Sequence, residues 1–305
     1  MTIPLTGEQY EIRAGEYAAT VTALGANLRA LSRGDRGLIT TYDPDVLPPS
    51  GSGMLLSPWP NRVDHGSYTF EGTTYQLALS EPTLDNAIHG LTRFELFSPL
   101  AQDSSSVTLR SPGHGAQGYP FAVQVDATYS LDAATGLTVA ITATNVGSRP
   151  APWGTAHHPY LAIAAPLIDG CDLTLPAAKW LPVDERLIPS GEPRDVAGSE
   201  LDFRAQKKIG DIQLDTAFTD LARDADGRAW VHLEGGGAHT GLWVDASYHW
   251  LQVFTSDALA PQQRRAALAV EPMTCPPNAF ASGIDRVRLA PGDAVTHRWG
   301  LRALD

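Results

Sequence analysis

Cysteine is almost absent from this sequence, which has two, Cys171 and Cys275, among 305 residues. Two cysteines make no disulfide framework, and no Cys-x-x-Cys pair indicates zinc binding or redox chemistry. The closest pair of histidines, His157 and His158, is adjacent in sequence, and neighbouring side chains on a strand point to opposite faces. The sequence therefore predicts no metal site.

Basic residues are also few, because 22 Lys and Arg stand against 34 Asp and Glu, a formal net charge of −12. Binding to nucleic acid needs clustered basic side chains, and only Lys207 and Lys208 are adjacent. Phosphate-binding loops, dinucleotide fingerprints and nucleophile elbows are missing as well. We therefore expect no nucleic-acid partner.

Long hydrophobic runs are missing, since none approaches the roughly 20 residues that a membrane helix requires. The first residues, MTIPLTGEQYEIRAGEY, have no basic segment followed by an apolar one, so they do not resemble a signal peptide. We expect a cytoplasmic protein without a membrane partner. The oligomeric state stays open.

Amphipathic helices are not apparent, whereas alternation with period two is common. Residues 121–131 and 136–147 alternate apolar and polar side chains, which is typical of half-buried antiparallel strands. Residues 67–77 read as a hairpin, and residues 260–268 as a loop or single turn. Because no linker or repeat divides the chain, we expect one domain, residues 1–305, built as a large antiparallel β-sandwich.

Two polar residues stand where a strand should be apolar. Glu271 follows three apolar residues and precedes Pro272, which favours an extended backbone and a rigid carboxylate at a strand end. His158 precedes Pro159, and its ordinary pKa of about 6.5 suits a general acid. Each has an ordinary alternative: Glu271 as a solvated strand end, and His158 as a hydrogen-bonded core residue.

Other polar groups suit the recognition of a sugar. Trp59, Asn61 and Arg62 combine an apolar ring face with fixed donors, although a packed Trp and a surface ion pair are equally compatible. His89 precedes a glycine, where the backbone approaches a ligand closely. Asp215 begins a strand-like run, a position at which aspartate is usually a cap or turn residue.

Seven segments in this order resemble the aldose 1-epimerase (galactose mutarotase) family. They are NRVDHGSYTFEGTTYQL, NAIHGL, HHPYL, LPVDERLIPSGEPRDVAGSELDF, LDTAF, LQVFT and EPMTCPPNAF. Phe254 and Leu161 depart from the family pattern, where Tyr and Phe are common, and both could reshape the pocket. The resemblance implies a two-sheet β-sandwich that interconverts the α and β anomers of a hexopyranose such as galactose or glucose, with no cofactor.

The resemblance also implies roles for individual residues. Glu271 would be the general base and His158 the general acid, while His157 would face away from the pocket in a structural role. The residues expected to bind the sugar are Arg62, His89 and Asp215, with Asn61 and Gln252 as further candidates.

Two alternatives to a neutral-sugar mutarotase remain. A phosphorylated or sulfonated hexose would need cations at the pocket, for which Arg62 and Arg93 are candidates. A non-catalytic carbohydrate-binding or sensor protein would keep Trp59, Arg62 and Asp215 but would need no paired acid and base. In each reading the partner is a small sugar.

Overall fold

The computed structural model describes residues 3–304, and these residues form three larger antiparallel sheets with three short two-stranded ones. The nine-stranded sheet has the order β10 (Ser98–Gln102), β11 (Ser106–Arg110), β12 (Val123–Asp132), β13 (Gly136–Asn145), β27 (Ala294–Ala303), β23 (Ala238–Val244), β22 (Ala229–Gly235), β17 (Asp172–Thr174) and β20 (Lys207–Lys208). The eight-stranded sheet has the order β19 (Arg194–Asp195), β18 (Ala177–Leu181), β21 (Asp215–Leu221), β24 (Trp250–Phe254), β25 (Leu268–Met273), β15 (Ala156–His157) and β5 (Leu55–Leu56), and β16 (Tyr160–Leu161) also pairs with β25.

A four-stranded sheet contains β1 (Gln9–Ala14), β2 (Tyr17–Thr22), β3 (Leu28–Arg33) and β4 (Arg36–Gly37). The two-stranded pairs are β6 (Arg62–Asp64) with β9 (Asn86–Ile88), β7 (Ser67–Phe70) with β8 (Thr73–Gln76), and β14 (Ala151–Trp153) with β26 (Val287–Leu289). Helical structure in residues 3–304 is limited to α1 (Ala279–Ser282) and the 3-10 turns η1 (Pro49–Gly51), η2 (Thr92–Phe94) and η3 (Ile168–Gly170).

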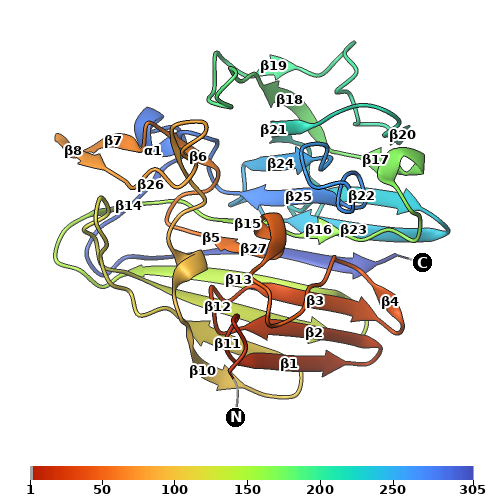
Figure 1. Cartoon of the computed structure of the whole chain (residues 1–305), viewed down its shortest axis with the longest axis horizontal. Helices are drawn as coiled ribbons and strands as arrows, with labels where there is room; N and C mark the ends of the chain where they lie inside the picture. Colours follow the sequence, from red (N-terminus) through yellow and green to blue (C-terminus); the bar gives the residue numbers. More distant parts are fainter. Residues whose placement is uncertain (1–2, 305) are drawn as a thin grey trace.

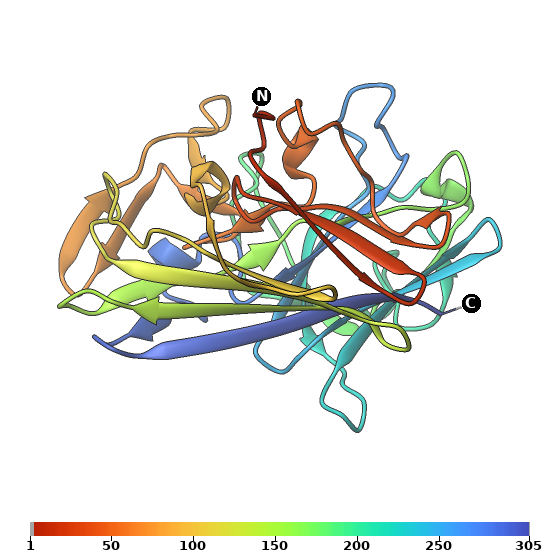
Figure 2. The same cartoon turned by 90° about the horizontal axis from the view of Figure 1, so that it is seen from below.

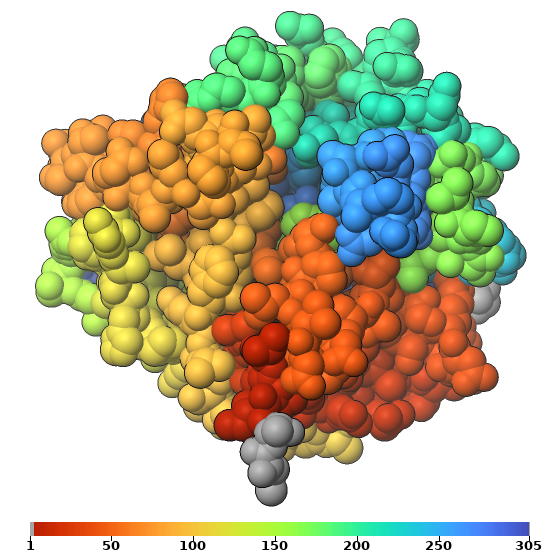
Figure 3. All heavy atoms as spheres, in the orientation of Figure 1, coloured from red at the N-terminus to blue at the C-terminus, as the bar shows by residue number. Residues whose placement is uncertain are grey.

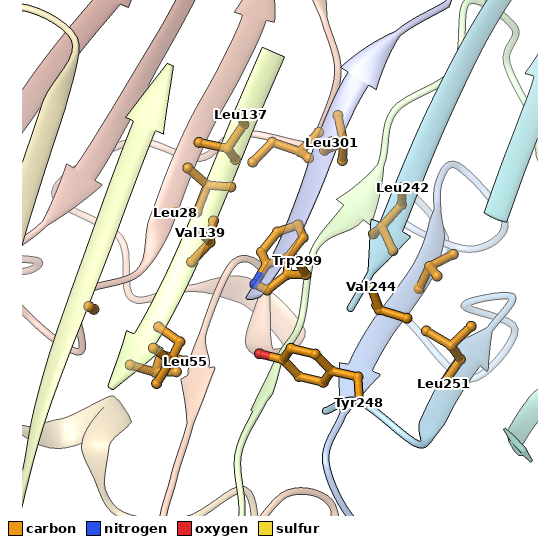
Figure 4. Packing of buried hydrophobic residues seen from close by; sticks show 14 of the residues in the cluster. Leu28, Leu55, Leu137, Val139, Leu242, Val244, Tyr248, Leu251, Trp299 and Leu301 are labelled. Carbon is orange, nitrogen blue, oxygen red and sulfur yellow. The ribbon is translucent and has the colours of Figure 1, made fainter. Parts of the chain in front are cut away.

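The nine-stranded sheet is one layer of a sandwich, and the other two large sheets cover it. Strands β1 and β2 contact β12, and the four-stranded sheet lies across that half of the layer (Figures 1 and 2). The eight-stranded sheet covers the other half, because Leu251 and Val270 from it share one buried cluster with Val244 and Trp299 of the nine-stranded sheet (Figure 4). The prediction of a large antiparallel β-sandwich is confirmed.

The alternation in the two longest predicted strands has the expected cause. Val125 and Tyr129 on β12 and Val139 and Ile141 on β13 are buried, while the residues next to each of them along the strand are partly exposed. A side chain that loses this burial loses both its transfer free energy and its packing, which for Leu or Ile cut to Ala costs about 2–5 kcal/mol. The alternating pattern therefore places each strand with one face in the core.

The local predictions for turns also hold. Strands β7 and β8 pair as a hairpin in which Phe70 is opposite Thr73, so Glu71 and Gly72 form a two-residue loop. Both loop residues have positive φ, 48° and 78°, as a type I′ turn requires. Of residues 260–268, predicted as a loop or single turn, 261–267 form turns and bends, and Leu268 already begins β25.

Within residues 3–304, no helix has the length and apolar character needed to cross a membrane.

Candidate active site

Three neighbouring strands bring the candidate catalytic and binding groups to one face of the eight-stranded sheet. On β24 and β25, Leu251 and Val270 point into the sandwich core, so Gln252 and Glu271, which follow them, point to the opposite face. Gln252 lies directly opposite Glu271 on the neighbouring strand. Asp215, at the start of β21, lies opposite Phe254, which is two residues after Gln252 on β24. Alternation thus places polar groups on the face that the loops cover.

Glu271 is not at the end of its strand, which corrects the expectation from the sequence. Strand β25 continues through Pro272 to Met273. The amide of Val270 donates to the carbonyl of Pro159, so the backbone nitrogen of Pro272, two residues later, faces the same side. The neighbouring strand is interrupted there between β15 and β16, so the missing N–H of proline breaks no ladder hydrogen bond.

The polar face opens into a cavity of about 480 Å³, which we call the site cavity. Figure 3 shows the surface hollowed between the orange, green and bright-blue parts of the chain. Six of the seven predicted site residues line it: Asn61, Arg62, His89, His158, Asp215 and Glu271. The size is within the range of about 300–1,000 Å³ that is usual for small-molecule sites.

The carboxylate of Glu271 and the imidazole of His158 form a buried pair inside the site cavity. Oε1 of Glu271 lies 3.4 Å from Nε2 of His158, and the two side chains are 3% and 6% exposed. Oε2 of Glu271 and Nδ1 of His158 are buried without a hydrogen-bond partner in residues 3–304. Burial raises the pKa of Glu271 well above its ordinary value and lowers that of His158 to about 4. Both shifts oppose charge, so burial favours the neutral carboxyl of Glu271 and the neutral imidazole of His158.

The chain holds His158 from several sides. Its backbone N–H donates to the carbonyl of Met54, and its carbonyl accepts from the N–H of Gly53, at 3.0 and 2.9 Å. The ring of Tyr160 stacks on the imidazole, with centroids 4.9 Å apart, and the Tyr160 hydroxyl donates to the carbonyl of Ser50. Gly51 approaches so closely that a Cβ there would lie 3.2 Å from Cδ2 of His158. These contacts restrict the imidazole to a narrow range of positions.

His157 points the other way, into the sandwich core. The indole N–H of Trp299 donates to its Nδ1 at 3.2 Å, so the proton of the neutral ring is on Nε2, which donates to the Tyr129 hydroxyl at 2.9 Å. Tyr129 in turn donates to the carbonyl of Ala26. Burial lowers the pKa of His157 to about 3. Both ring nitrogens are thus used in packing, which supports the structural role expected for this residue.

Arg62 contributes a positive charge to the same cavity, but most of its guanidinium is already engaged. Its Nε and Nη2 donate to the two carboxylate oxygens of Glu81 at 2.8 and 2.9 Å, which leaves Nη1 for a ligand. The charge of Arg62 lowers the pKa of both Asp215 and Glu271, although burial outweighs it and each pKa is raised. The arrangement is an acid–base pair beside a fixed cation and an aspartate.

The sequence pattern of the aldose 1-epimerase family matches residues 8–302. The chain belongs to this family. It is 35% identical over 287 residues to the uncharacterized Escherichia coli protein YihR, covering 94% of this chain and 90% of that protein. It is 30% identical to human galactose mutarotase over 164 residues, which are 52% of this chain and 46% of the human protein.

Solved structures of the family share the fold of this chain. A putative aldose 1-epimerase from Escherichia coli superposes with a TM-score of 0.83 at 22% identity, covering 97% of this chain and 98% of that one. An aldose epimerase homologue from C. elegans gives 0.84 at 19% identity, with 98% and 99% covered.

Not every residue that the aldose 1-epimerase resemblance suggested lies at the cavity. Gln252 is buried behind Asp215, to which its Nε2 donates at 2.6 Å, so it orients that carboxylate. Leu161 is fully buried in the core cluster, whereas Phe254 lines the cavity. Trp59, which the sequence left open between stacking on a sugar and packing in a loop, does not line the cavity, and its ring packs against Phe280.

Asn61 and His89 stand together at one edge of the cavity. Both have positive φ, 48° and 63°, and the N–H of His89 donates to the carbonyl of Asn61. Burial is the largest cause of a strong lowering of the pKa of His89, so its ring is neutral, and its Nδ1 is buried without a partner in residues 3–304. A neutral imidazole of this kind donates and accepts hydrogen bonds, as recognition of hydroxyl groups requires.

Two residues at the cavity were missed as site candidates by the sequence reasoning. Glu81 precedes a proline, as Glu271 does, so the same signal was present there. Tyr160 lies in the HHPYL segment, two residues after His158, on the same side of the chain. No group of three or more His, Cys, Asp or Glu among residues 3–304 is arranged to hold a metal ion.

Proposed function

We propose that this chain catalyses the interconversion of the α and β anomers of an aldopyranose by acid–base ring opening. The observation that carries the proposal is the buried pair of Glu271 and His158, 3.4 Å apart at the wall of the 480 Å³ cavity. A sugar-binding protein needs hydroxyl-binding groups alone, and burying an acid and a base side by side without other partners is costly. The name of the human relative, galactose mutarotase, supports the same reaction class.

The reaction requires one proton to leave the sugar and one to reach it. Glu271 as carboxylate removes the proton from the anomeric hydroxyl O1, and Nε2–H of His158 gives a proton to the ring oxygen O5. The C1–O5 bond breaks as the C1–O1 bond becomes a carbonyl. Rotation about C1–C2 presents the other face of the aldehyde, and the two residues reverse their roles as the ring closes. O1 and O5 are bound to the same carbon, so they suit a base and an acid that lie side by side.

The number of protons on the pair also suits this reaction. In the form that burial favours, with Glu271 protonated and His158 neutral, the pair holds one proton. The reactive state, a carboxylate beside an imidazolium, holds the same one proton. The pair therefore needs no proton from solvent to become active, and the positive charge of Arg62 favours the carboxylate form of Glu271.

The remaining cavity groups would bind the hydroxyls of the substrate. Nη1 of Arg62, the ring of His89 and the carboxylate of Asp215 provide donors and acceptors around the acid–base pair, with Asn61 beside them. Gln252 acts through Asp215, to which it is hydrogen bonded. Glucose and galactose are the neutral substrates to try first.

Exchange between anomer signals in proton NMR spectra tests the proposal against a sugar-binding protein. The protein is added to anomeric mixtures of glucose and of galactose, and also of their acidic derivatives, and magnetisation transfer between the α and β H1 signals is measured. Transfer above the rate without protein for any of these sugars supports the proposal. Ligand binding without transfer for all of them would overturn it.

A further inference from the structure

A second cavity, of about 220 Å³, adjoins the site cavity, and we call it the side cavity. Ser50, Tyr160 and Leu259 line both cavities. The Tyr160 hydroxyl donates to the carbonyl of Ser50 at 3.0 Å, so this contact is part of the wall that the two cavities share. The loop of residues 256–267, in the bright-blue part of the chain beside the hollow in Figure 3, contributes Leu259 to that wall. The side cavity is otherwise lined by residues that take no part in the acid–base site.

The lining of the side cavity is polar but uncharged. Among residues 3–304, no Asp, Glu, Lys, Arg or His lines it, whereas Arg62, Arg93, Asp215 and Glu271 all line the site cavity. Hydroxyl and amide groups donate and accept hydrogen bonds, as the hydroxyls of a sugar do. An ionised ligand would meet no opposite charge there, so the lining favours a neutral ligand that carries hydroxyl groups. Besides the shared wall, the hydrogen-bonding side chains are those of Thr40, Thr41, Tyr42, Ser52, Gln262 and Gln263.

The hydroxyl of Tyr42 lines the side cavity without a partner. Tyr42 is 9% exposed, and its hydroxyl oxygen is buried with no hydrogen-bond partner in residues 3–304. Burial raises the pKa of Tyr42, so the hydroxyl keeps its proton and can both donate and accept. A buried hydroxyl that is left unsatisfied is costly, and buried polar groups are normally hydrogen bonded. A ligand hydroxyl in the side cavity would provide the missing partner.

We propose that the side cavity binds a second, neutral sugar unit, so that the substrate is a reducing disaccharide whose free anomeric end lies at Glu271 and His158. The proposal rests on the anomer interconversion proposed above. The ring of Tyr160 stacks on the imidazole of His158 with centroids 4.9 Å apart, and Tyr160 also lines the side cavity. A sugar ring held at His158 is therefore separated from the side cavity by one side chain.

The size and the remaining surface of the side cavity fit one sugar unit. A volume of about 220 Å³ corresponds to roughly seven water molecules at their liquid volume of about 30 Å³ each, which leaves room for one further ring but not for a longer chain. Pro49, Ala266 and Ala267 add apolar surface for the C–H groups of that ring. Because the second unit is joined to the ring in the site cavity, its binding is intramolecular, and a few neutral hydrogen bonds are enough to raise the affinity.

The test compares glucose with its reducing α-linked dimers kojibiose, nigerose, maltose and isomaltose, in which the second glucose is attached at O2, O3, O4 and O6 respectively. Anomer exchange of the reducing ring is measured by magnetisation transfer, after subtraction of the rate without protein. The expected result is a kcat/KM for at least one dimer that exceeds the value for glucose tenfold or more, mainly through a lower KM. One linkage should be preferred, because the second ring has to pass Tyr160 to reach the side cavity.

Variants assign the preference to the side cavity. Tyr42→Phe should lower kcat/KM for the preferred dimer about threefold or more, as expected for one lost hydrogen bond, and leave the value for glucose unchanged. Tyr248→Phe is the matched control, because its hydroxyl is likewise buried without a partner in the described residues while Tyr248 packs in the core cluster. Neither change breaks a hydrogen bond that the structure shows, so both variants should fold. Ala266→Phe fills the side cavity and should reduce the preferred dimer to the level of glucose.

The outcomes separate this inference from the function on which it rests. A kcat/KM for glucose equal to or above that of every dimer would overturn the inference and leave the anomer interconversion intact. An unchanged ratio of dimer to glucose in Tyr42→Phe, or in a folded Ala266→Phe protein, would also overturn it.

A binding measurement decides on the side cavity even without catalysis. If the wild type accelerates none of these sugars and none of those named for the proposed function, that function fails. Calorimetric titration with the dimers then tests the side cavity alone. Binding of a dimer that is weaker in Tyr42→Phe than in Tyr248→Phe would support the subsite, and equal binding or no binding in both would overturn it.

Discussion

Oε1 of Glu271 lies 3.4 Å from Nε2 of His158, and both side chains are almost completely buried. Strand β25 carries the carboxylate, and the segment between β15 and β16, both paired with β25, carries the imidazole. Because the two groups are this close, their titrations are coupled, and the resulting pKa values belong to the pair.

The coupled pair predicts the pH dependence of the reaction. The active state holds one proton, so kcat/KM falls below about pH 4, where His158 also becomes protonated, and again above the raised pKa of Glu271, where the pair loses its proton. Activity should therefore be flat from about pH 5 up to the raised pKa of Glu271. Ordinary pKa values of about 4.3 and 6.5 would instead give a maximum between them and a loss of activity above pH 6.5. Anomer exchange measured from pH 3.5 to 10 distinguishes the two profiles.

His157 should matter for stability and not for the chemical step. His157→Leu leaves the buried indole N–H of Trp299 without an acceptor, which costs about 1–3 kcal/mol, and adds the loss of the bond to Tyr129. We expect urea denaturation at pH 7 to show a free energy of unfolding lower by roughly 2–4 kcal/mol, with anomer exchange retained by the folded protein. A variant as stable as the wild type, or one folded but inactive, would contradict this assignment.

The same histidine makes the wild type less stable in acid. Its pKa is about 3 in the folded protein and about 6.5 when unfolded, so between these values the unfolded chain binds more protons. Stability therefore falls as the pH drops from about 6.5 towards 3. In His157→Leu, the plot of unfolding free energy against pH should be less steep in this range, by the amount that corresponds to about one bound proton.

Gly51 should be required because of His158. Gly51→Ala places a Cβ 3.2 Å from Cδ2 of the imidazole at a φ of +79°, so it strains the backbone and displaces the ring. Gly72→Ala is the matched control, with a φ of +78° and nothing within 4 Å of the added Cβ. Both should lose about 1–2 kcal/mol of stability from the left-handed backbone. Only Gly51→Ala should lower kcat, roughly tenfold or more, since small displacements of a catalytic group are costly. Equal activity of the two variants would contradict the role of Gly51.

Glu81 should act as a positioning residue for Arg62. Glu81→Gln breaks a two-oxygen interaction and frees a guanidinium beside Asp215 and Glu271, so KM should rise about 10-fold or more while kcat changes less. Asp126→Asn breaks an equivalent two-oxygen contact with Arg110 on the nine-stranded sheet and should change neither constant. Steady-state anomer exchange measures the split. A drop in kcat alone, with KM as in the wild type, would count against positioning of the substrate.

The sequence predicted the fold well wherever one residue pattern decides the structure. Alternation on β12 and β13 indicated which side chains enter the core, and Glu71-Gly72 indicated the hairpin turn. Pro272 was misread, because its effect on β25 depends on a gap in a neighbouring strand that is more than 100 residues away in sequence.

The site was predictable as a set of residues but not as a network. Ordered motifs indicated Glu271, His158 and Arg62, and all three line one cavity. The partner of Arg62 is Glu81, which lies on another segment, and local sequence contains no sign of their contact. Trp59 could not be assigned from sequence, because an aromatic residue next to polar ones gives the same pattern whether its ring faces a ligand or the core.

The change in optical rotation of a freshly dissolved α anomer, with the wild type and Glu271→Gln side by side, tests the central claim most directly. The sugar used is the one with the fastest anomer exchange among glucose, galactose and their acidic derivatives. Circular dichroism verifies that both proteins are folded. The account predicts that the wild type accelerates mutarotation and that Glu271→Gln loses at least about 10²-fold of that acceleration. A folded Glu271→Gln protein with nearly full activity would show that this carboxylate is not the base.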